Sequence, residues 1–284
     1  MIFRSQMFNK VAIMGVGLMG GSLGMAMKKH RLAEHVIGVS AHASSLEEAV
    51  KNKAIDIGYT EIEKGVKEAD LVILATPVDT ILKLFALINP HLKRGCLVTD
   101  LGGTKSSIVE AAEKNLSNPS FFIGSHPLAG SEKQGVSFAR PDLFEKSFCI
   151  VTPTAKTNPM AKEKIRYLWT KIGADVKFLS PEEHDEILAY ISHLPHLIAY
   201  GLMEAIPKEF IPYAAQGLKD STRIAASSPQ VWSDICLNNS TNVLKSLDEF
   251  VKNLFHFRKA VVDQDDKSLI EHFTKAKEKR EELK

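Results

Sequence analysis

The feature that most restricts the fold of this chain is a glycine-rich turn at Gly15–Gly20, with the pattern G-x-G-x-x-G. The turn follows an apolar run at Val11–Met14 that is typical of a buried strand, and it opens a segment of helical character. The first glycine permits a tight turn, the second lets the backbone approach a pyrophosphate, and the third lets the helix pack closely on the strand. A pyrophosphate would then rest on the free N–H groups of a helix N-terminus. The turn predicts a dinucleotide site made by Gly15, Gly17, Leu18, Met19 and Gly20; the alternative is a glycine-rich turn without a ligand.

Strand-like and helix-like segments alternate along the first 179 residues. Runs that are apolar on both faces are typical of strands covered by helices on both sides, and the alternation favours right-handed βαβ units. The sequence therefore predicts an α/β fold with a Rossmann-type, doubly wound sheet. Its strands are expected at 11–14, 36–39, 71–75, 96–99, 121–123, 148–151 and 175–179.

The pattern changes after Ser180-Pro181-Glu182-Glu183, which has the serine cap, early proline and acidic first turn of a helix start. The rest of the chain has helical patterns alone. We expect a dinucleotide-binding domain at 1–179 and an all-α domain for substrate binding and dimerisation at 180–284. The last long helix carries an apolar seam of heptad type, which indicates either packing within the domain or an interface between two copies. The seam residues are Val243, Leu247, Phe250, Leu254, Phe257 and Val261.

Composition narrows the classes of protein that remain. The chain has 284 residues, enough for about two domains, with 44% hydrophobic and 25% charged residues. A net charge of +2 argues against a nucleic-acid partner. The scattered residues Cys96, Cys149 and Cys236 match neither a disulfide framework nor a zinc site, so we expect no bound metal. With neither a leader pattern nor a membrane span, a cytoplasmic protein without a membrane partner is expected.

The residues after the second strand bear on the choice of nucleotide. NAD-binding sites usually place Asp or Glu there to bind the ribose 2′-hydroxyl. This chain has Ser40 and His42 instead, with neighbouring serines at 44 and 45. These groups can donate to a 2′-phosphate and do not repel it, so NADP is weakly favoured over NAD. The alternative is a polar loop that caps the next helix.

A histidine lies at the end of a strand in Gly124-Ser125-His126-Pro127. Pro127 cannot donate to a strand ladder, so the strand is expected to stop there and to hold the His126 imidazole at its end. Open α/β sheets bind ligands at such ends, and histidine accepts a proton from a hydroxyl near neutral pH. Taken alone, such a histidine is as often structural as catalytic.

Two further clusters carry candidate functional groups. In Ser192-His193-Leu194-Pro195-His196, the proline interrupts a helical stretch, and the two histidines share a face. The structural alternative is a kinked core helix. In Lys219-Asp220-Ser221-Thr222-Arg223, the arginine can bind a carboxylate through two hydrogen bonds, worth about 1.5–3 kcal/mol. The alternative there is a surface pair between Asp220 and Arg223.

Together these segments resemble the prephenate/arogenate dehydrogenase family of tyrosine biosynthesis. The resemblance covers about residues 10–251. It rests on the glycine turn, Ala75-Thr76-Pro77, Asp100 with its following glycines, and the motifs at 124–130, 192–196 and 220–225.

The resemblance implies an enzyme that oxidises the ring hydroxyl of a cyclohexadienyl acid, passes hydride to NAD(P) and releases CO2 as the ring becomes aromatic. His126 resembles the catalytic histidine and Arg223 the arginine that binds a substrate carboxylate. His196 resembles a side-chain-binding histidine often associated with prephenate, and His193 and Ser192 would shape the same wall. Ser131, Glu132 and Lys219 match positions near the substrate, and Thr76 and Pro77 match cofactor contacts. Prephenate is the expected substrate, arogenate is the alternative, and a homodimer through the C-terminal helices is expected.

The chain departs from the family pattern at Gly103. Many members carry at this place a serine whose hydroxyl bonds the catalytic histidine. Here Thr104 or a water would have to orient His126, or the histidine is held less firmly. Two remoter hypotheses are a β-hydroxyacid dehydrogenase, whose Gly-x-x-x-Lys-x-x-Asn motif we do not find, and a non-catalytic dimer that senses the nucleotide.

Overall fold

The computed structural model describes residues 7–130 and 133–283 of the chain. Its centre is an eight-stranded sheet in the order β3-β2-β1-β4-β5-β6-β7-β8. The strands are β1 (Phe8–Met14), β2 (Ala33–Val39), β3 (Ile57–Tyr59), β4 (Leu71–Leu74), β5 (Leu97–Asp100), β6 (Phe122–Pro127), β7 (Phe148–Thr152) and β8 (Asp175–Phe178). All seven expected strands are present and the Rossmann-type sheet is confirmed, while the short edge strand β3 was missed.

Each of the strands β1 to β6 pairs in parallel with its neighbours among these six strands, but β7 pairs antiparallel with β6. The expectation of βαβ units throughout the first 179 residues is therefore wrong at this step. A parallel return needs a crossover, usually a helix. Within its described residues, the connection from β6 to β7 has a single short 3₁₀ turn, η3 (Val136–Phe138), so the strand returns in the opposite direction. The last pair, β7 and β8, is again parallel, with a helix between the two strands.

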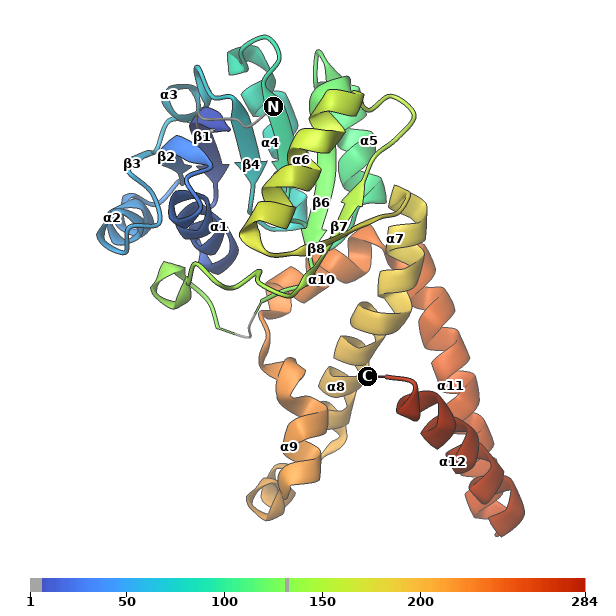
Figure 1. Cartoon of the computed structure of the whole chain (residues 1–284). Coiled ribbons are helices and arrows are strands. Elements are labelled where there is room, and N and C mark those ends of the chain that lie inside the picture. The colour runs from blue at the N-terminus through green and yellow to red at the C-terminus, as the bar shows by residue number, and fades with distance from the viewer. Residues whose placement is uncertain (1–6, 131–132, 284) are drawn as a thin grey trace. The chain divides into compact units, whose positions relative to one another are not determined.

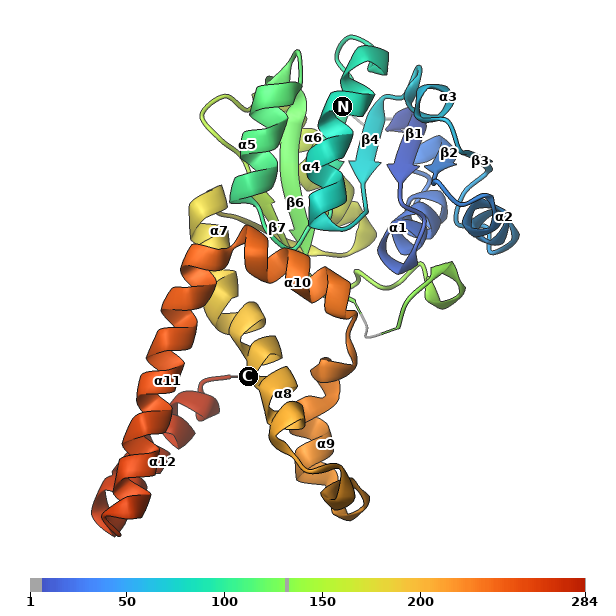
Figure 2. The same ribbon diagram turned by 180° about the vertical axis from the view of Figure 1, so that it is seen from behind.

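Helices cover both faces of the sheet. Figure 1 shows α1 (Leu18–Lys29) and α6 (Pro159–Ile172) on one face, and Figure 2 shows α4 (Val78–Ile88) and α5 (Ser106–Asn115) on the other. Two hydrophobic clusters fill the layers between sheet and helices. Each cluster contains a pair of aromatic rings packed edge to face. The ring centroids lie 5.4 Å apart for Phe144 and Trp169 in one cluster and 5.2 Å apart for Phe85 and Phe122 in the other. The outer strands β2 and β3 are flanked by α2 (Ala43–Lys51) and α3 (Ile62–Val66).

The helical region begins as its sequence predicts. Ser180 caps α7 (Pro181–Leu188): its Oγ accepts from the Glu183 N–H at 3.1 Å, and the Glu183 carboxylate accepts from the Ser180 N–H at 2.8 Å. The expected break near Pro195 is a π-helical segment, Ala189–His193, followed by α8 (Leu194–Ala205). Such segments relieve the hydrogen bond that proline cannot make. Helix α9 (Gln216–Thr222) packs on α8, and α10 (Pro229–Asn238) packs on α4.

The chain divides into two compact units, one ending at Asn239 and the other beginning at Ser240. The second unit holds α11 (Ser240–Val262) and α12 (Asp266–Glu281), joined by ring contacts of Phe257 with His272 and Phe273. The predicted boundary at residue 179 falls between β8 and α7, inside the first unit, and stays a prediction. Within the described residues, we find no helix long and apolar enough to cross a membrane.

Candidate active site

The glycine turn has the geometry that a pyrophosphate requires. Gly15 has φ +92°, and a Cβ there would lie 2.8 Å from the Ala75 carbonyl oxygen, so a side chain is excluded. A Cβ at Gly20 would clash with the Gly15 carbonyl oxygen, which shows how closely α1 approaches the end of β1. At Gly17 a Cβ would meet nothing within 4 Å, so space is open in front of the helix N-terminus. Leu18 and Met19 are the first residues of α1, and their N–H groups face this end.

The turn also lies at the topological switch point of the sheet, where β1 has β2 on one side and β4 on the other. Thr76 follows the end of β4, and its methyl group would contact a Cβ at Gly15. The Thr76 hydroxyl is buried and has no hydrogen-bond partner among the described residues. Pro77 then caps α4. An orphaned buried hydroxyl beside an open glycine cradle fits a bound dinucleotide.

The loop after β2 keeps its side chains available. Ser40 Oγ accepts from the His42 N–H at 3.2 Å, which makes a tight local turn. Helix α2 starts at Ala43, directly after this loop, and its N-terminus has no side-chain cap. The polar side chains of this loop therefore do not serve as the helix cap.

His126 lies at the edge of the sheet where the parallel strands end. It is the last residue but one of β6, and β6 stops at Pro127 as predicted. Ser125 fixes this strand end: its N–H donates to Asp100 Oδ1 at 3.2 Å, and its hydroxyl accepts from the Trp169 ring N–H at 3.2 Å. The glycine before it, Gly124, leaves room for the Lys105 side chain, whose Cδ a Cβ would meet at 3.1 Å.

His126 is held by a second histidine. His126 Nδ1 lies 2.8 Å from His184 Nε2, and His184 Nδ1 lies 2.8 Å from Asp185 Oδ1. Asp185 in turn accepts from the N–H groups of Lys105 at 2.7 Å and Ser106 at 2.9 Å, the start of α5. His184 and Asp185 are fully buried in the first turns of α7, whereas His126 stays partly exposed. The carboxylate of Asp185 therefore anchors both a helix N-terminus and the histidine pair.

This arrangement answers the question raised by Gly103. Thr104 does not hold His126; its hydroxyl lies 3.5 Å from the hydroxyl of Ser107. A Cβ at residue 103 would lie 2.9 Å from the Cδ1 of Ile235, so α10 takes the space of a side chain there. Among the described residues, the partner of His126 comes from α7 instead, so the expectation that Thr104 orients the ring is wrong.

A buried ion pair lies beneath the histidines. Lys105 Nζ donates to Asp100 Oδ2, and both side chains are completely buried. Asp100 also accepts from the Gly102 N–H at 2.8 Å and thereby shapes the turn after β5. Burial raises the pKa of Asp100, and the attraction of Lys105 opposes that change.

These surroundings favour a neutral His126. Burial lowers its pKa well below the ordinary value, and the positive charges that His184 and Lys105 can carry lower it further. Burial also lowers the pKa of His184, against the hydrogen bond to Asp185. For Asp185, burial alone would raise the pKa, but hydrogen bonds from His184 and Ser106 outweigh it and leave the carboxyl ionised. A neutral imidazole has one bare ring nitrogen that can accept a proton.

A second cluster forms around Trp232 of α10. The His196 ring stacks on the indole, with centroids 3.4 Å apart and planes 20° from parallel. Burial lowers the pKa of His196 to about 4, and the charge of Arg223 contributes in the same direction, so the two side chains are neighbours. His196 Nδ1 is buried without a hydrogen-bond partner in the described part of the chain. Lys219 lies in α9 and Arg223 directly after the end of this helix, and both residues are exposed.

The remaining predicted residues have different positions. His193 is buried, with Nδ1 3.2 Å from Asn239 Nδ2, and burial lowers its pKa to about 4. Its ring also meets the Trp232 ring edge-on, with the two centroids 6.1 Å apart. The Asp220 carboxylate accepts a hydrogen bond from the Gln216 side chain at 2.6 Å, in place of the surface pair with Arg223 that the sequence offered as an alternative. Ser131 and Glu132 lie outside the described residues.

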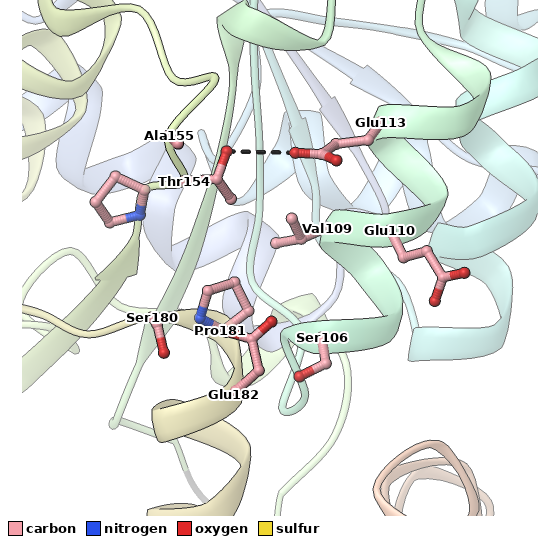
Figure 3. A pocket seen from close by; sticks show the side chains of 10 residues that line it. Ser106, Val109, Glu110, Glu113, Thr154, Ala155, Ser180, Pro181 and Glu182 are labelled. Atoms are coloured by element: carbon pink, nitrogen blue, oxygen red, sulfur yellow. Dashed lines mark hydrogen bonds between the residues drawn. The ribbon is translucent and has the colours of Figure 1, made fainter.

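A cavity of about 550 Å³ lies between α5 and α7, away from the predicted site residues (Figure 3). Three carboxylates line it, from Glu110, Glu113 and Glu182. Figure 3 shows Thr154 donating to Glu113, at 3.3 Å, and Lys156 also pairs with that carboxylate at 2.8 Å. Such a lining repels a pyrophosphate or a dicarboxylate, so this cavity does not fit either ligand.

Sequence reasoning missed His184, Asp185, Lys105 and Trp232 as parts of the site. For the first two, a signal was present: a His-Asp pair in the first turns of a well-capped helix, where a carboxylate can reach another helix N-terminus. Lys105 and Trp232 carried no comparable signal, because an isolated lysine or tryptophan usually lies on the surface or in a core.

A dinucleotide cradle at the switch point of a Rossmann-type sheet, with a neutral histidine at the same edge, defines a nicotinamide-dependent oxidoreductase. Two family models agree: residues 23–178 match "Prephenate dehydrogenase, nucleotide-binding domain" and residues 180–275 match "Prephenate dehydrogenase, dimerization domain". The chain belongs to the prephenate dehydrogenase family of NAD(P)-dependent oxidoreductases.

Individual relatives match over nearly the whole chain. A prephenate dehydrogenase of Bacillus subtilis is 37% identical over 98% of this chain and 77% of its own length. A cyclohexadienyl dehydrogenase of Zymomonas mobilis is 36% identical over 98% of this chain and 97% of its own. The crystal structure of prephenate dehydrogenase from A. aeolicus, in complex with hydroxyphenyl propionate and NAD+, has a TM-score of 0.90 at 34% identity, covering 97% of this chain and 98% of that one.

Proposed function

We propose that this chain oxidises prephenate to 4-hydroxyphenylpyruvate and CO2, with His126 Nε2 as the base that takes the proton of the ring hydroxyl. The observation that carries the proposal is the hydrogen bond between His126 Nδ1 and His184, which leaves Nε2 of the partly exposed His126 ring without a partner among the described residues. A positioned general base contributes about 10²–10⁴ to the rate.

A bound nicotinamide would supply the acceptor for the hydride of the ring carbon that carries the hydroxyl. Gly15, Gly17 and the N-terminus of α1 would hold its pyrophosphate, and Thr76 would donate or accept a hydrogen bond beside it. Rearomatisation then releases the ring carboxylate as CO2. The protein's task is to orient the hydroxyl toward His126 and the ring carbon toward the nicotinamide.

The substrate anchors are Arg223 and His196. The guanidinium suits a carboxylate, and the unpartnered His196 Nδ1 suits the polar side chain of the substrate. Lys219 adds a positive charge on the same side of α9. Ser131, Glu132 and, indirectly, His193 complete the proposed substrate site. Arogenate is the second candidate because the relative from Zymomonas mobilis is named for cyclohexadienyl substrates in general.

Three broader properties belong to the same proposal. Ser40 and His42 favour NADP over NAD, because no carboxylate among them repels a 2′-phosphate. The dimerization-domain match and the exposed apolar residues of α11 and α12 support a homodimer. Three cysteines that are all free support a reducing, cytoplasmic location.

An assay of both substrates with both nucleotides tests the reaction. Purified protein is mixed with prephenate or arogenate and with NAD+ or NADP+, and reduced nicotinamide is followed by absorbance. We expect the highest kcat/KM with prephenate and NADP+. A protein that reduces neither nucleotide with either substrate would sink the proposal.

His126→Asn tests the role of the base. We expect kcat to fall by about 10²–10⁴, while the affinity for the nucleotide, measured by fluorescence titration, is unchanged. Replacement of the exposed His35 on β2 by Asn is the matched control and leaves both quantities unchanged. Full turnover by the His126 variant would remove this histidine from its proposed role.

A further inference from the structure

The proton positions of the Asp185–His184–His126 series follow from its geometry. An ionised carboxylate only accepts, so His184 Nδ1, 2.8 Å from Asp185 Oδ1, carries a hydrogen. Neutral His184 then has a bare Nε2, which accepts. His126 Nδ1, 2.8 Å away, must therefore donate. The same logic leaves His126 Nε2 bare, so the buried carboxylate fixes the tautomer of both rings.

We propose that His184 and Asp185 are positioning residues that hold His126 as the Nδ1–H tautomer and share the proton that His126 takes from the substrate. The inference rests on the proposed function. When His126 Nε2 gains the hydroxyl proton, the Nδ1–H bond breaks and His184 Nε2–H forms. The result is a neutral His126 and a protonated His184 in contact with Asp185. One proton enters the series, and no other reactant is needed.

The charged groups around the series favour this transfer. Lys105 lies near both rings and disfavours positive charge on either one. Of the two histidines, only His184 contacts Asp185. A proton that moves from His126 to His184 therefore places its positive charge next to the negative carboxylate. Asp100, which pairs with Lys105, has a weaker effect of the same sign on His184.

Two more titratable groups face the series from other elements. His193, in the π-helical segment, adds a small repulsion toward a charged His126. Cys149 on β7 lies near Lys105 and Asp100, and burial raises the pKa of its thiol well above the ordinary value, so it stays neutral. Neither group competes with Asp185 for the proton.

The inner anchor of the series is rigid. Asp185 Oδ1 also accepts from the Lys105 N–H at 2.7 Å, and Oδ2 accepts from the Ser106 N–H at 2.9 Å. The Asn239 side chain donates to the Asp185 carbonyl at 2.7 Å, which ties α10 to α7. Two N–H groups at the start of α5 thus hold the Asp185 carboxylate, and Asn239 holds its backbone, which favours one orientation of the carboxylate toward His184.

The first experiment reads the tautomers directly and needs no substrate. Protein with ¹⁵N-labelled histidine is studied by NMR at neutral pH, with His126→Asn and His184→Gln used to assign signals. We expect Nδ1–H with an unprotonated Nε2 for both His126 and His184. A protonated Nε2 on His126 in the free protein would overturn the proposal, and this result is independent of which substrate the enzyme accepts.

The second experiment follows the pH dependence of kcat in two variants. In His184→Gln, Asp185 orients the amide so that its oxygen still accepts from His126, but the second proton site is gone. In Asp185→Asn, an acceptor remains but the charge is gone. In both, protonated His126 loses stabilisation, so we expect kcat to drop by about 10-fold or more and the acid limb of the profile to move to lower pH.

Controls separate this role from a merely structural one. Thermal unfolding of each variant checks the fold. If Asp185→Asn unfolds the protein because α5 loses its cap, His184→Gln still tests the proposal, since it leaves Asp185 in place. His35→Gln is the surface control and leaves the profile unchanged. An unchanged kcat and acid limb in folded His184→Gln would overturn the proposal. If the wild-type protein turns over neither substrate, the proposed function fails while the tautomer measurement still decides this inference.

Discussion

At the scale of single residues, the glycines of the turn have separable roles. Gly15 and Gly20 meet backbone atoms where a Cβ would be, so they are required for folding. Gly17 faces open space, so it is required only when a pyrophosphate approaches. The predicted tight turn at Gly15 and close helix packing at Gly20 agree with this geometry, whereas the role of Gly17 in pyrophosphate binding stays a prediction.

We predict opposite outcomes for alanine at two of these positions. Gly20→Ala forces α1 away from β1 and lowers the free energy of unfolding by at least about 1–3 kcal/mol. Gly17→Ala leaves stability unchanged but weakens nucleotide binding by about tenfold or more, since 1.4 kcal/mol of lost contact already has that effect. Thermal unfolding and nucleotide titration of both variants check this. A Gly17→Ala protein that binds the nucleotide as well as wild type would contradict the assigned role.

Residue identity predicted the position of His126 at the strand end but not its hydrogen-bond partner. A proline directly after a strand histidine is a local signal, and it was sufficient to place the imidazole at the strand end. His184 lies 58 residues further along the chain. Nothing local in the sequence indicates that α7 delivers this side chain to β6, so the partner became visible only in the folded protein.

At the scale of elements, the turn between β5 and α5 concentrates the buried charge. Asp100 ends β5 and Lys105 precedes α5, and their ion pair lies below the strand end that carries His126. Breaking a buried pair leaves one charge without compensation, whereas replacing both partners is much less costly.

A double-mutant cycle measures this pair. We expect Lys105→Met alone and Asp100→Asn alone to cost about 3–5 kcal/mol each in the free energy of unfolding. The double variant should cost clearly less than the sum, as measured by urea denaturation. Additive costs would show that the two side chains do not stabilise each other.

The connection from β6 to β7 explains an error in the predicted topology. Alternation of strands and helices predicts parallel pairs, but β7 returns antiparallel because no helix is found in the described part of its connection to β6. Apolar strands covered on both faces have the same pattern in either direction. The direction of β7 was therefore not predictable from its residues.

At the scale of the whole molecule, α11 carries apolar residues that its own unit does not cover. Phe257 packs on α12, but Leu254 is 48% and Val261 64% exposed. Of the two interpretations of the heptad seam, packing within the unit accounts for Phe257, and a second copy is the proposed cover for Leu254 and Val261. Val243 is already buried. A dimer interface removes such surface from water at about 25 cal/mol per Å².

Leu254→Glu tests the dimer. A charge in an apolar helix interface is costly, so we expect this variant to shift the protein toward a monomer, as measured by light scattering coupled to size exclusion. Asn253→Glu adds the same charge at the adjacent, exposed position and should leave the dimer intact. Identical masses for wild type and both variants would argue against α11 as the interface.

Four histidines with lowered pKa values make stability depend on pH. The pKa values of His126 and His184 lie below the ordinary value, and those of His193 and His196 are lowered to about 4. Below pH 6.5 the unfolded chain binds protons at these residues that the folded chain does not. Stability is therefore present in full above pH 6.5 and is lost as the pH falls toward 4.

We expect the free energy of unfolding to decrease steadily as the pH falls from 6.5 toward 4, with each such histidine contributing at most about 1.4 kcal/mol per pH unit. His193→Gln removes one of the four and should flatten the dependence. Urea denaturation at several pH values measures both. A stability that is constant or rises as the pH falls in this window would contradict the lowered pKa values.

The sequence by itself determined the Rossmann-type sheet, the dinucleotide cradle and the histidine at the strand end, because each depends on residues within one short unit. Tertiary structure alone decided what holds that histidine. Ile235 of α10 fills the space beside Gly103, and His184 with Asp185 of α7 takes over the contact to His126. These contacts join elements that lie far apart in the chain, and only packing decides which of them come within hydrogen-bond distance.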